Sequence, residues 1–283
     1  MSLVSERVGQ FFVDDHRLEF TEYGGGDRWV VLLPARLQTR RMHQPLARRI
    51  AASGAHVVTL DLLGHGRSDR PGDPTAYSAE RFAEHVIALL DHLGAPAAVV
   101  GGTSLGANVA LEVAVGAPAR VRGLLLEAPA LDNAVEAGAV AWTSLLLAAR
   151  FAPITVAGVR TAVRVVPRRL VPFWAGVALD GLDQRPVALA ATLHGLCFGR
   201  TAPASRERSL LDVPALVIGY GGDPLHPVSD AILLADEIPG ARLVRARGAW
   251  EWRLRPGRLD EEAISFVAAC HDDDPVRTRL VGG

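Results

Sequence analysis

The feature that most constrains the fold is a repeated alternation between short, predominantly apolar segments and longer segments of helical pattern. The apolar segments lie at 29–33, 56–61, 97–100 and 121–126. The segments between them, at 39–52, 78–93 and 105–116, are predicted helices, and 78–93 fits an amphipathic pattern. Strands that are apolar on both faces and separated by helices indicate a parallel sheet covered by helices on both sides. We therefore predict an α/β fold with a mostly parallel central sheet.

The alternating pattern is preceded by a predicted hairpin and interrupted by a long helical segment. Residues 7–22 form a predicted hairpin that turns at 14–16, ahead of the first buried strand. After Pro129 only helical, Ala/Val/Leu-rich segments broken by prolines appear, until about residue 208. Strands and helices then resume at 215–218, 228–237, 242–244 and 260–270. The predicted organisation is a core formed by 1–130 and 209–283, with a helical cap inserted at 131–208.

A glycine-flanked serine follows the strand that ends at Val100. Gly102-Thr103-Ser104-Leu105-Gly106 matches the pattern G-x-S-x-G between a strand and a helix. So sharp a turn strains the serine backbone and leaves no room for side chains at the two glycines. The turn would expose the Ser104 hydroxyl above the sheet, with the Leu105 amide at the helix N-terminus available to stabilise an oxyanion.

This motif and the loop Asp61–Pro71, which reads DLLGHGRSDRP, give the chain its family likeness. Over nearly its whole length it resembles the α/β-hydrolase superfamily, of the esterase or lipase-like kind. The resemblance implies that Ser104 is a nucleophile and that Asp223, after the strand 215–218, is the acid of a catalytic triad. It also implies that the amides of Leu105 and Arg36 form the oxyanion hole.

The sequence departs from the family where the triad histidine is expected. After the strand 242–244 it reads Arg-Gly-Ala-Trp-Glu, so that Glu251 stands at the histidine position by spacing. A carboxylate there would compete with Asp223 for one proton and would make a poor base. His226 and His65 lie in loops at the same edge of the sheet as Ser104 and are candidates for a relocated base.

The oxyanion loop also departs from the family pattern. The family commonly has His-Gly after the strand 29–33, whereas this chain has Pro34-Ala35-Arg36, and proline supplies no N–H donor. The cap contains aromatic side chains that could roof an apolar pocket, namely Trp142, Phe151, Phe173, Trp174 and Phe198. Such a roof favours a small hydrophobic substrate.

Composition excludes several other functions. The formal net charge is −1, with 30 basic and 31 acidic residues, so no global field attracts nucleic acid. The sequence contains no lysine, which rules out Schiff-base chemistry and a phosphate-binding P-loop. Cys197 and Cys270 show no metal-ligand spacing. Neither a secretory signal nor an apolar run long enough to span a membrane is present. We predict a cytoplasmic protein without cofactor or metal, and leave open whether it forms a homo-oligomer.

Two functional hypotheses follow. The first is a serine hydrolase that acts on a small apolar ester or related acyl substrate through Ser104, with Asp223 as acid and Glu251, His226 or His65 as base. The second is an impaired hydrolase-fold protein that binds a small hydrophobic ligand or serves as a scaffold. A lyase or a cofactor-independent oxygenase is a third alternative, because one fold hosts several chemistries.

Overall fold

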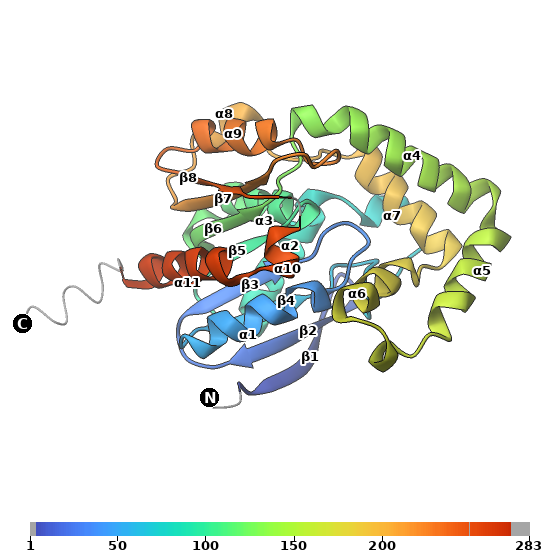
Figure 1. The fold of residues 1–283 in the computed structure, drawn as a ribbon, viewed down its shortest axis with the longest axis horizontal. Helices are drawn as coiled ribbons and strands as arrows, with labels where there is room; N and C mark the ends of the chain where they lie inside the picture. The colour runs from blue at the N-terminus through green and yellow to red at the C-terminus, as the bar shows by residue number, and fades with distance from the viewer. Residues whose placement is uncertain (1–3, 249, 273–283) are drawn as a thin grey trace, which may run out of the picture.

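An eight-stranded, mostly parallel sheet forms the centre of the molecule. The computed structural model describes residues 4–248 and 250–272 and orders the strands β1-β2-β4-β3-β5-β6-β7-β8 (Figure 1). The strands are β1 (Glu6–Val13), β2 (His16–Gly24), β3 (Trp29–Leu33), β4 (His56–Leu60), β5 (Ala98–Thr103), β6 (Val121–Glu127), β7 (Ala215–Tyr220) and β8 (Arg242–Ala246). Strand β2 is antiparallel to β1 and β4, and the other neighbouring strands are parallel. The predicted fold class is confirmed.

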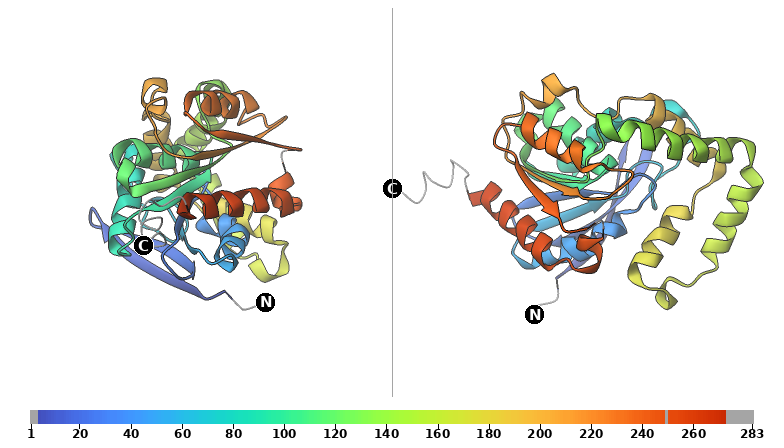
Figure 2. Two further views of the ribbon diagram at one scale, coloured as in Figure 1. Left: turned by 90° about the vertical axis from the view of Figure 1, so that its left-hand side faces the viewer. Right: turned by 45° about the horizontal axis from the view of Figure 1, so that its top comes forward.

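Both faces of the sheet are buried, as the uniformly apolar strands indicate. Val31 and Leu33 face one core, and Val30 and Leu32 face the other, because successive residues of a strand point to opposite sides. On the first face lie α2 (Ala79–His92), α3 (Leu105–Gly116) and α9 (Val228–Glu237). On the second face lie α1 (Gln44–Ala52) and α11 (Gly257–Asp272) (Figure 2).

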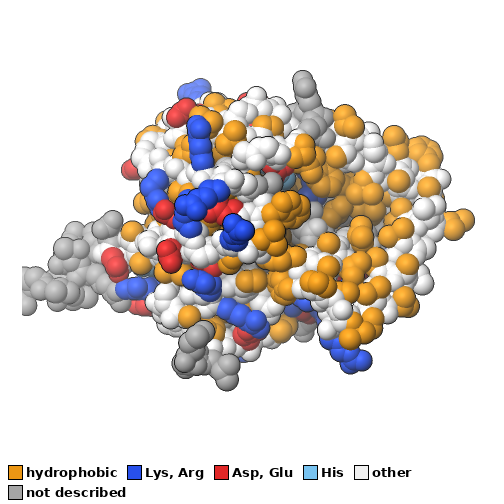
Figure 3. Space-filling view, in the orientation of Figure 1, with side chains coloured by type: hydrophobic (Ala, Val, Ile, Leu, Met, Phe, Trp, Pro, Cys, Tyr) orange, Lys and Arg blue, Asp and Glu red, His pale blue; other side chains and the backbone are white. Residues whose placement is uncertain are grey.

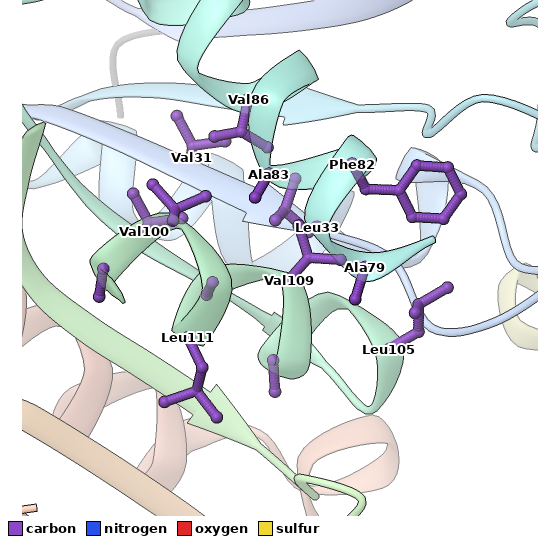
Figure 4. Packing of buried hydrophobic residues seen from close by; sticks show 14 of the residues in the cluster. Val31, Leu33, Ala79, Phe82, Ala83, Val86, Val100, Leu105, Val109 and Leu111 are labelled. Atoms are coloured by element: carbon purple, nitrogen blue, oxygen red, sulfur yellow. The ribbon is translucent and has the colours of Figure 1, made fainter. Parts of the chain in front are cut away.

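The core beneath the predicted nucleophile is tightly packed. Phe82 and Val86 of α2 pack together with Val109 of α3 against the strands β3 and β5 (Figure 4). The Ser78 hydroxyl caps α2 by accepting a hydrogen bond from the Arg81 amide at 3.2 Å, which satisfies a free donor of the first turn. Helix α3 is buried along most of its length, so the turn that precedes it rests on a rigid base.

Between β6 and β7 the described chain forms helices and no strand. They are α4 (Val135–Phe151), α5 (Pro153–Arg164), α6 (Phe173–Leu182), α7 (Pro186–Phe198) and the short α8 (Ser205–Arg208). Pro153 and Pro186 are the first residues of their helices, where a missing N–H costs nothing. We call residues 132–208 the helical insertion; it extends to one side of the sheet, with α5 farthest out (Figures 1 and 2).

The surface of the helical insertion is unusually apolar. Many of its large hydrophobic side chains are exposed, and they gather on the face shown in Figure 3. They include Val140, Phe151, Ile154, Val159, Val165 and Leu170. Among the described residues, no single helix has the length and apolar character to cross a membrane. Taken together, the helical segments Gly138–Phe151 and Pro153–Arg164 have the length and composition of a membrane span, but they are bent by 100° relative to each other.

One element was not expected. The short helix α10 (Glu251–Leu254) begins at the residue that spacing placed at the family's histidine position. The segment after β8 therefore coils into a helical turn, and this turn decides where the side chains of Glu251 and Arg253 lie.

Candidate active site

Ser104 occupies a strained turn between β5 and α3. Its backbone has φ 54° and ψ −113°, in a region that residues with a side chain rarely adopt. A Cβ atom at Gly102 would lie 2.4 Å from the Leu33 carbonyl oxygen, and one at Gly106 would lie 2.2 Å from it. The two glycines are therefore required by the close approach of β3. The Ser104 amide donates to the Glu127 carbonyl at 2.9 Å, which ties the turn to β6.

The structure places His226 against Ser104. The Nε2 atom of His226 lies 2.7 Å from the Ser104 Oγ atom, and its Nδ1 atom lies 3.1 Å from Oδ2 of Asp223. The other oxygen of Asp223, Oδ1, accepts the amides of Leu225 at 2.9 Å and of His226 at 3.1 Å. A tight turn after β7 thus holds the carboxylate and the imidazole in one piece.

These contacts define the hydrogen-bond directions of the neutral site. An ionised carboxylate can only accept, so Nδ1 of His226 carries the proton and donates it to Asp223. Nε2 is then an acceptor, and the Ser104 hydroxyl donates to it. Burial raises the pKa of Asp223, but hydrogen bonds from His226 and the Leu225 amide outweigh burial and hold the pKa below its ordinary value. Asp223 is therefore ionised at neutral pH and fixes this tautomer.

Glu251 and His65, the other two candidates for the base, are engaged elsewhere. The Glu251 carboxylate accepts hydrogen bonds from Arg258 at 2.9 and 3.0 Å and from the Arg247 amide. The Arg258 contact lowers the pKa of Glu251, so it holds its proton less readily than an ordinary glutamate. His65 is fully buried and its Nδ1 bonds the Leu63 carbonyl at 2.9 Å, while burial lowers its pKa to about 4. Of the three candidates, only His226 contacts Ser104.

A buried ion pair lies behind the elbow, and sequence reasoning did not find it. Both oxygens of Glu127, at the end of β6, accept from Arg253 of α10 at 2.6 and 2.8 Å. Glu127 also accepts the hydroxyls of Thr103 and Tyr220. Burial raises the pKa of Glu127, but Arg253 and the two hydroxyls bring it below its ordinary value. The segment that carries a histidine in the family thus supplies a cation that neutralises a carboxylate next to the nucleophile turn.

A pocket of about 280 Å³ opens beside Ser104. It is lined by Ser104, Leu105 and His226 from the core and by apolar side chains of α4 and α7, such as Trp142 and Leu196. Arg36 also lines this pocket, so both residues expected to form the oxyanion hole line the same pocket as Ser104. The Ala35 amide is directed away, since it contacts the Met42 sulfur at 3.2 Å.

A second hollow, of about 450 Å³, lies apart from this site. It is lined largely by charged side chains that pair with one another, as Arg40 does with Asp61 and Arg41 with Asp180. Neither Ser104 nor His226 lines it. We therefore locate the chemistry in the smaller pocket.

Two buried polar residues that we did not predict hold the pocket walls in place. The side-chain amide of Asn108, one turn after Ser104, donates to the carbonyls of Ala130 at 2.8 Å and Thr201 at 2.9 Å. These two residues lie near the two ends of the helical insertion. Asp230 of α9 is fully buried and accepts the amides of Leu131, Asn133 and Ala134. In α3 the available signal was a polar residue, Asn108, between apolar neighbours, which usually marks a specific hydrogen bond. Helix α9 contains several polar residues, so its sequence does not single out Asp230.

Comparison with known proteins agrees with this architecture. Residues 28–160 match the family model described as alpha/beta hydrolase fold. Over 70 residues the chain is 44% identical to the 2-hydroxymuconate semialdehyde hydrolase of Pseudomonas putida, a match that spans only 25% of either chain. It is 27% identical over 220 residues to a haloalkane dehalogenase of Mycolicibacterium paratuberculosis, covering 75% of this chain and 73% of that one.

A solved structure extends the likeness to nearly the whole chain. A hydrolase from Pseudomonas aeruginosa superposes with a TM-score of 0.75 at 24% identity, covering 92% of this chain and 98% of that one. An α/β fold with a strained, glycine-flanked turn at Ser104 is the class that the architecture and site define. The chain therefore has the α/β-hydrolase fold, and the family model of that name matches it over residues 28–160.

Proposed function

We propose that this protein is a serine hydrolase of the esterase-like kind, with Ser104 as nucleophile, His226 as general base and Asp223 as the acid that orients the base. The observation that carries the proposal is the chain of contacts from Ser104 Oγ to His226 Nε2 at 2.7 Å and from His226 Nδ1 to Asp223 at 3.1 Å. A nucleophile hydrogen-bonded to a base that a third group orients is the signature of nucleophilic catalysis.

In the acylation step, the Ser104 oxygen attacks the ester carbonyl carbon while Nε2 of His226 accepts the hydroxyl proton. The negative charge that develops on the carbonyl oxygen is stabilised by the Leu105 amide at the N-terminus of α3. Arg36, through its backbone amide, is the proposed second donor. The ester C–O bond then breaks, and His226 returns its proton to the departing alcohol.

The deacylation step repeats this chemistry with water. Nε2 of His226 removes a proton from a water molecule, whose oxygen attacks the acyl carbon bound to Ser104. Collapse of the intermediate releases the carboxylic acid and restores the Ser104 hydroxyl with the proton held by His226. Asp223 stays ionised throughout and stabilises the transient imidazolium.

The relatives are consistent with hydrolysis, although their substrates differ. The matched proteins are named as a 2-hydroxymuconate semialdehyde hydrolase and a haloalkane dehalogenase, and one solved neighbour is an enol-lactonase from Burkholderia xenovorans. The apolar wall formed by α4 and α7 favours, for this chain, an acyl substrate with a small hydrophobic body.

A fluorophosphonate probe tests the proposal, because it forms an adduct only with a serine whose hydroxyl is activated. We expect labelling of the wild-type protein on Ser104, none in Ser104→Ala, and a large loss in His226→Ala. Glu251→Gln is the matched control and should label like the wild type. Absence of an adduct in the wild-type protein would refute the hydrolase and leave a ligand-binding protein of the same fold.

A further inference from the structure

The active-site pocket contains a cation that the proposed triad does not use. The Arg36 side chain, from the loop after β3, lines the same pocket as Ser104 and His226. Its surroundings are partly dehydrated, and burial lowers the pKa of its guanidinium group. A guanidinium removed from water needs hydrogen-bond acceptors or a counter-charge in return.

The described part of the protein offers the Arg36 guanidinium few hydrogen-bond acceptors and no carboxylate as a counter-charge. Its guanidinium carbon lies 5.0 Å from the centre of the Trp142 ring, a cation–π contact that fixes the plane of the group. One of its nitrogens contacts the Cys197 sulfur at 3.7 Å, and sulfur is a weak acceptor. Across the described residues, no carboxylate lies within ion-pair distance of Arg36. Several of its five donors therefore remain available on the pocket side.

The other arginine of the pocket wall provides a contrast. Arg200 is held by Glu112 at 2.8 and 3.1 Å and by Glu207 at 2.8 Å, so that its charge is neutralised within the protein. The same wall thus contains two different guanidinium groups. That of Arg200 is paired with carboxylates, whereas that of Arg36 stacks on Trp142 and has no oxygen partner among the residues that the structure describes. This difference indicates that Arg36 is kept for a group that arrives with the ligand.

We propose that Arg36 binds a carboxylate of the substrate, so that the preferred substrate is an ester or related acyl compound with a short apolar body and a free carboxylate. A guanidinium fork matches a carboxylate in two parallel hydrogen bonds, and the pair strengthens where water is excluded. This inference rests on the proposed function, and it revises the expectation of a wholly apolar substrate by adding one anionic group.

Matched esters test this specificity. Mono-4-nitrophenyl esters of glutarate, adipate and suberate carry a free carboxylate at increasing distance from the scissile bond. Their methyl-ester counterparts have nearly the same shape without the charge. We expect the wild-type enzyme to show a higher kcat/KM for the anionic member of at least one pair, at the chain length that spans from Ser104 to Arg36.

Variants of Arg36 separate charge recognition from other roles. We expect Arg36→Met to lower the ratio of kcat/KM for the preferred anionic ester to kcat/KM for its neutral counterpart by roughly tenfold or more, the size of a lost charge-assisted contact. Arg36→Lys, which keeps the charge, should restore part of the preference. Equal losses for both members of a pair would overturn the inference, because the side chain would then stabilise the oxyanion or the fold. So would a wild-type enzyme that does not distinguish the two esters.

A binding measurement separates this inference from the proposed function. Isothermal titration calorimetry measures the binding of monomethyl adipate without catalytic turnover. It is carried out on the Ser104→Ala variant and on the double variant Ser104→Ala, Arg36→Met. Binding that is lost with Arg36 supports the carboxylate site even if the fluorophosphonate probe fails to label Ser104. Labelling of Ser104 together with equal binding in both variants would leave the hydrolase standing and refute the carboxylate site.

Discussion

Asp223 and His226 are only three residues apart, so the proposed acid and base reach Ser104 from one turn. The carboxylate caps the amides of Leu225 and His226 with one oxygen and orients the imidazole with the other. The side-chain distances that matter for proton transfer are therefore set by local backbone geometry after β7. Packing between two separate loops is not needed to align acid and base.

The substitution Asp223→Asn tests this local coupling. An amide at this position could donate to Nδ1 and stabilise the tautomer in which Nε2 carries the proton, so that the base could not accept from Ser104. We expect kcat/KM to fall by roughly four orders of magnitude, as in a serine protease with the same change. Glu251→Gln is the matched control, because it alters a carboxylate that contacts Arg258, and steady-state kinetics should find it close to wild type. Similar losses in both variants would contradict the assignment.

The pair of Glu127 and Arg253 is a second residue-scale feature with a measurable consequence. Arg253→Met would leave a buried carboxylate without its cation, and we expect the free energy of unfolding to fall by about 3–5 kcal/mol. Adding Glu127→Gln removes the uncompensated charge and should recover part of the loss. Urea denaturation of the two single variants and the double variant measures this. A double variant no more stable than Arg253→Met would show that the pair does not act through charge compensation.

At the scale of elements, the helical insertion is hydrogen-bonded to the core close to Ser104. Asn108 contacts the chain where it leaves β6 and again where it returns, and Asp230 binds the first turn after β6. The base of the pocket is therefore held by α3 and α9, whereas α5 lies far from the sheet (Figure 1). Motion of the outer helices could admit substrate without disturbing the triad.

Removing one fastening should loosen the insertion selectively. Asn108→Ala leaves the carbonyls of Ala130 and Thr201 without their donor, which we expect to cost about 1–3 kcal/mol of unfolding free energy. Limited proteolysis should then cut sooner within residues 132–208 than elsewhere. Thr161→Ala is a suitable control, since its exposed hydroxyl bonds only within its own helix. If both variants are digested at the wild-type rate, Asn108 does not anchor the insertion.

Most of the strands and longer helices could be predicted from the sequence because each has a recognisable local pattern, whereas the short helix α10 was not expected. The position of Ser104 was equally accessible, because only a glycine-flanked turn satisfies the close approach of β3. The choice among Glu251, His226 and His65 was not accessible, since it depends on how short turns aim side chains. The turn at Asp223 directs His226 inward, and helix α10 directs Glu251 toward Arg258. The pairing of Glu127 with Arg253 joins residues 126 positions apart and left no local pattern.

For the whole molecule, three interior histidines link stability to pH. His43, His65 and His85 are almost fully buried, and burial lowers the pKa of each to about 4. In the unfolded chain the value is near 6.5. Between these two pH values the unfolded state binds more protons than the folded state, so the folded state loses stability as pH falls.

We therefore expect the free energy of unfolding to decrease steadily as the pH is lowered from about 6.5 to about 4. Denaturant titrations at a series of pH values measure this slope. His85→Gln should make the slope shallower, because one of the three protonation sites is gone. A stability that stays constant across this interval would show that the histidines take up protons without unfolding.

The segment Gly222–Pro227 shows where a protein of this fold can carry both a catalytic acid and a catalytic base. The proposed acid and base both lie within these six consecutive residues. The proposed proton transfer therefore does not require the stretch after β8, whose Arg253 instead pairs with Glu127. We expect that the segment Gly222–Pro227 can be grafted onto a related protein of the same fold from which the catalytic histidine has been removed. Restored turnover in such a chimera would show that a catalytic dyad can be inherited as a single piece of backbone.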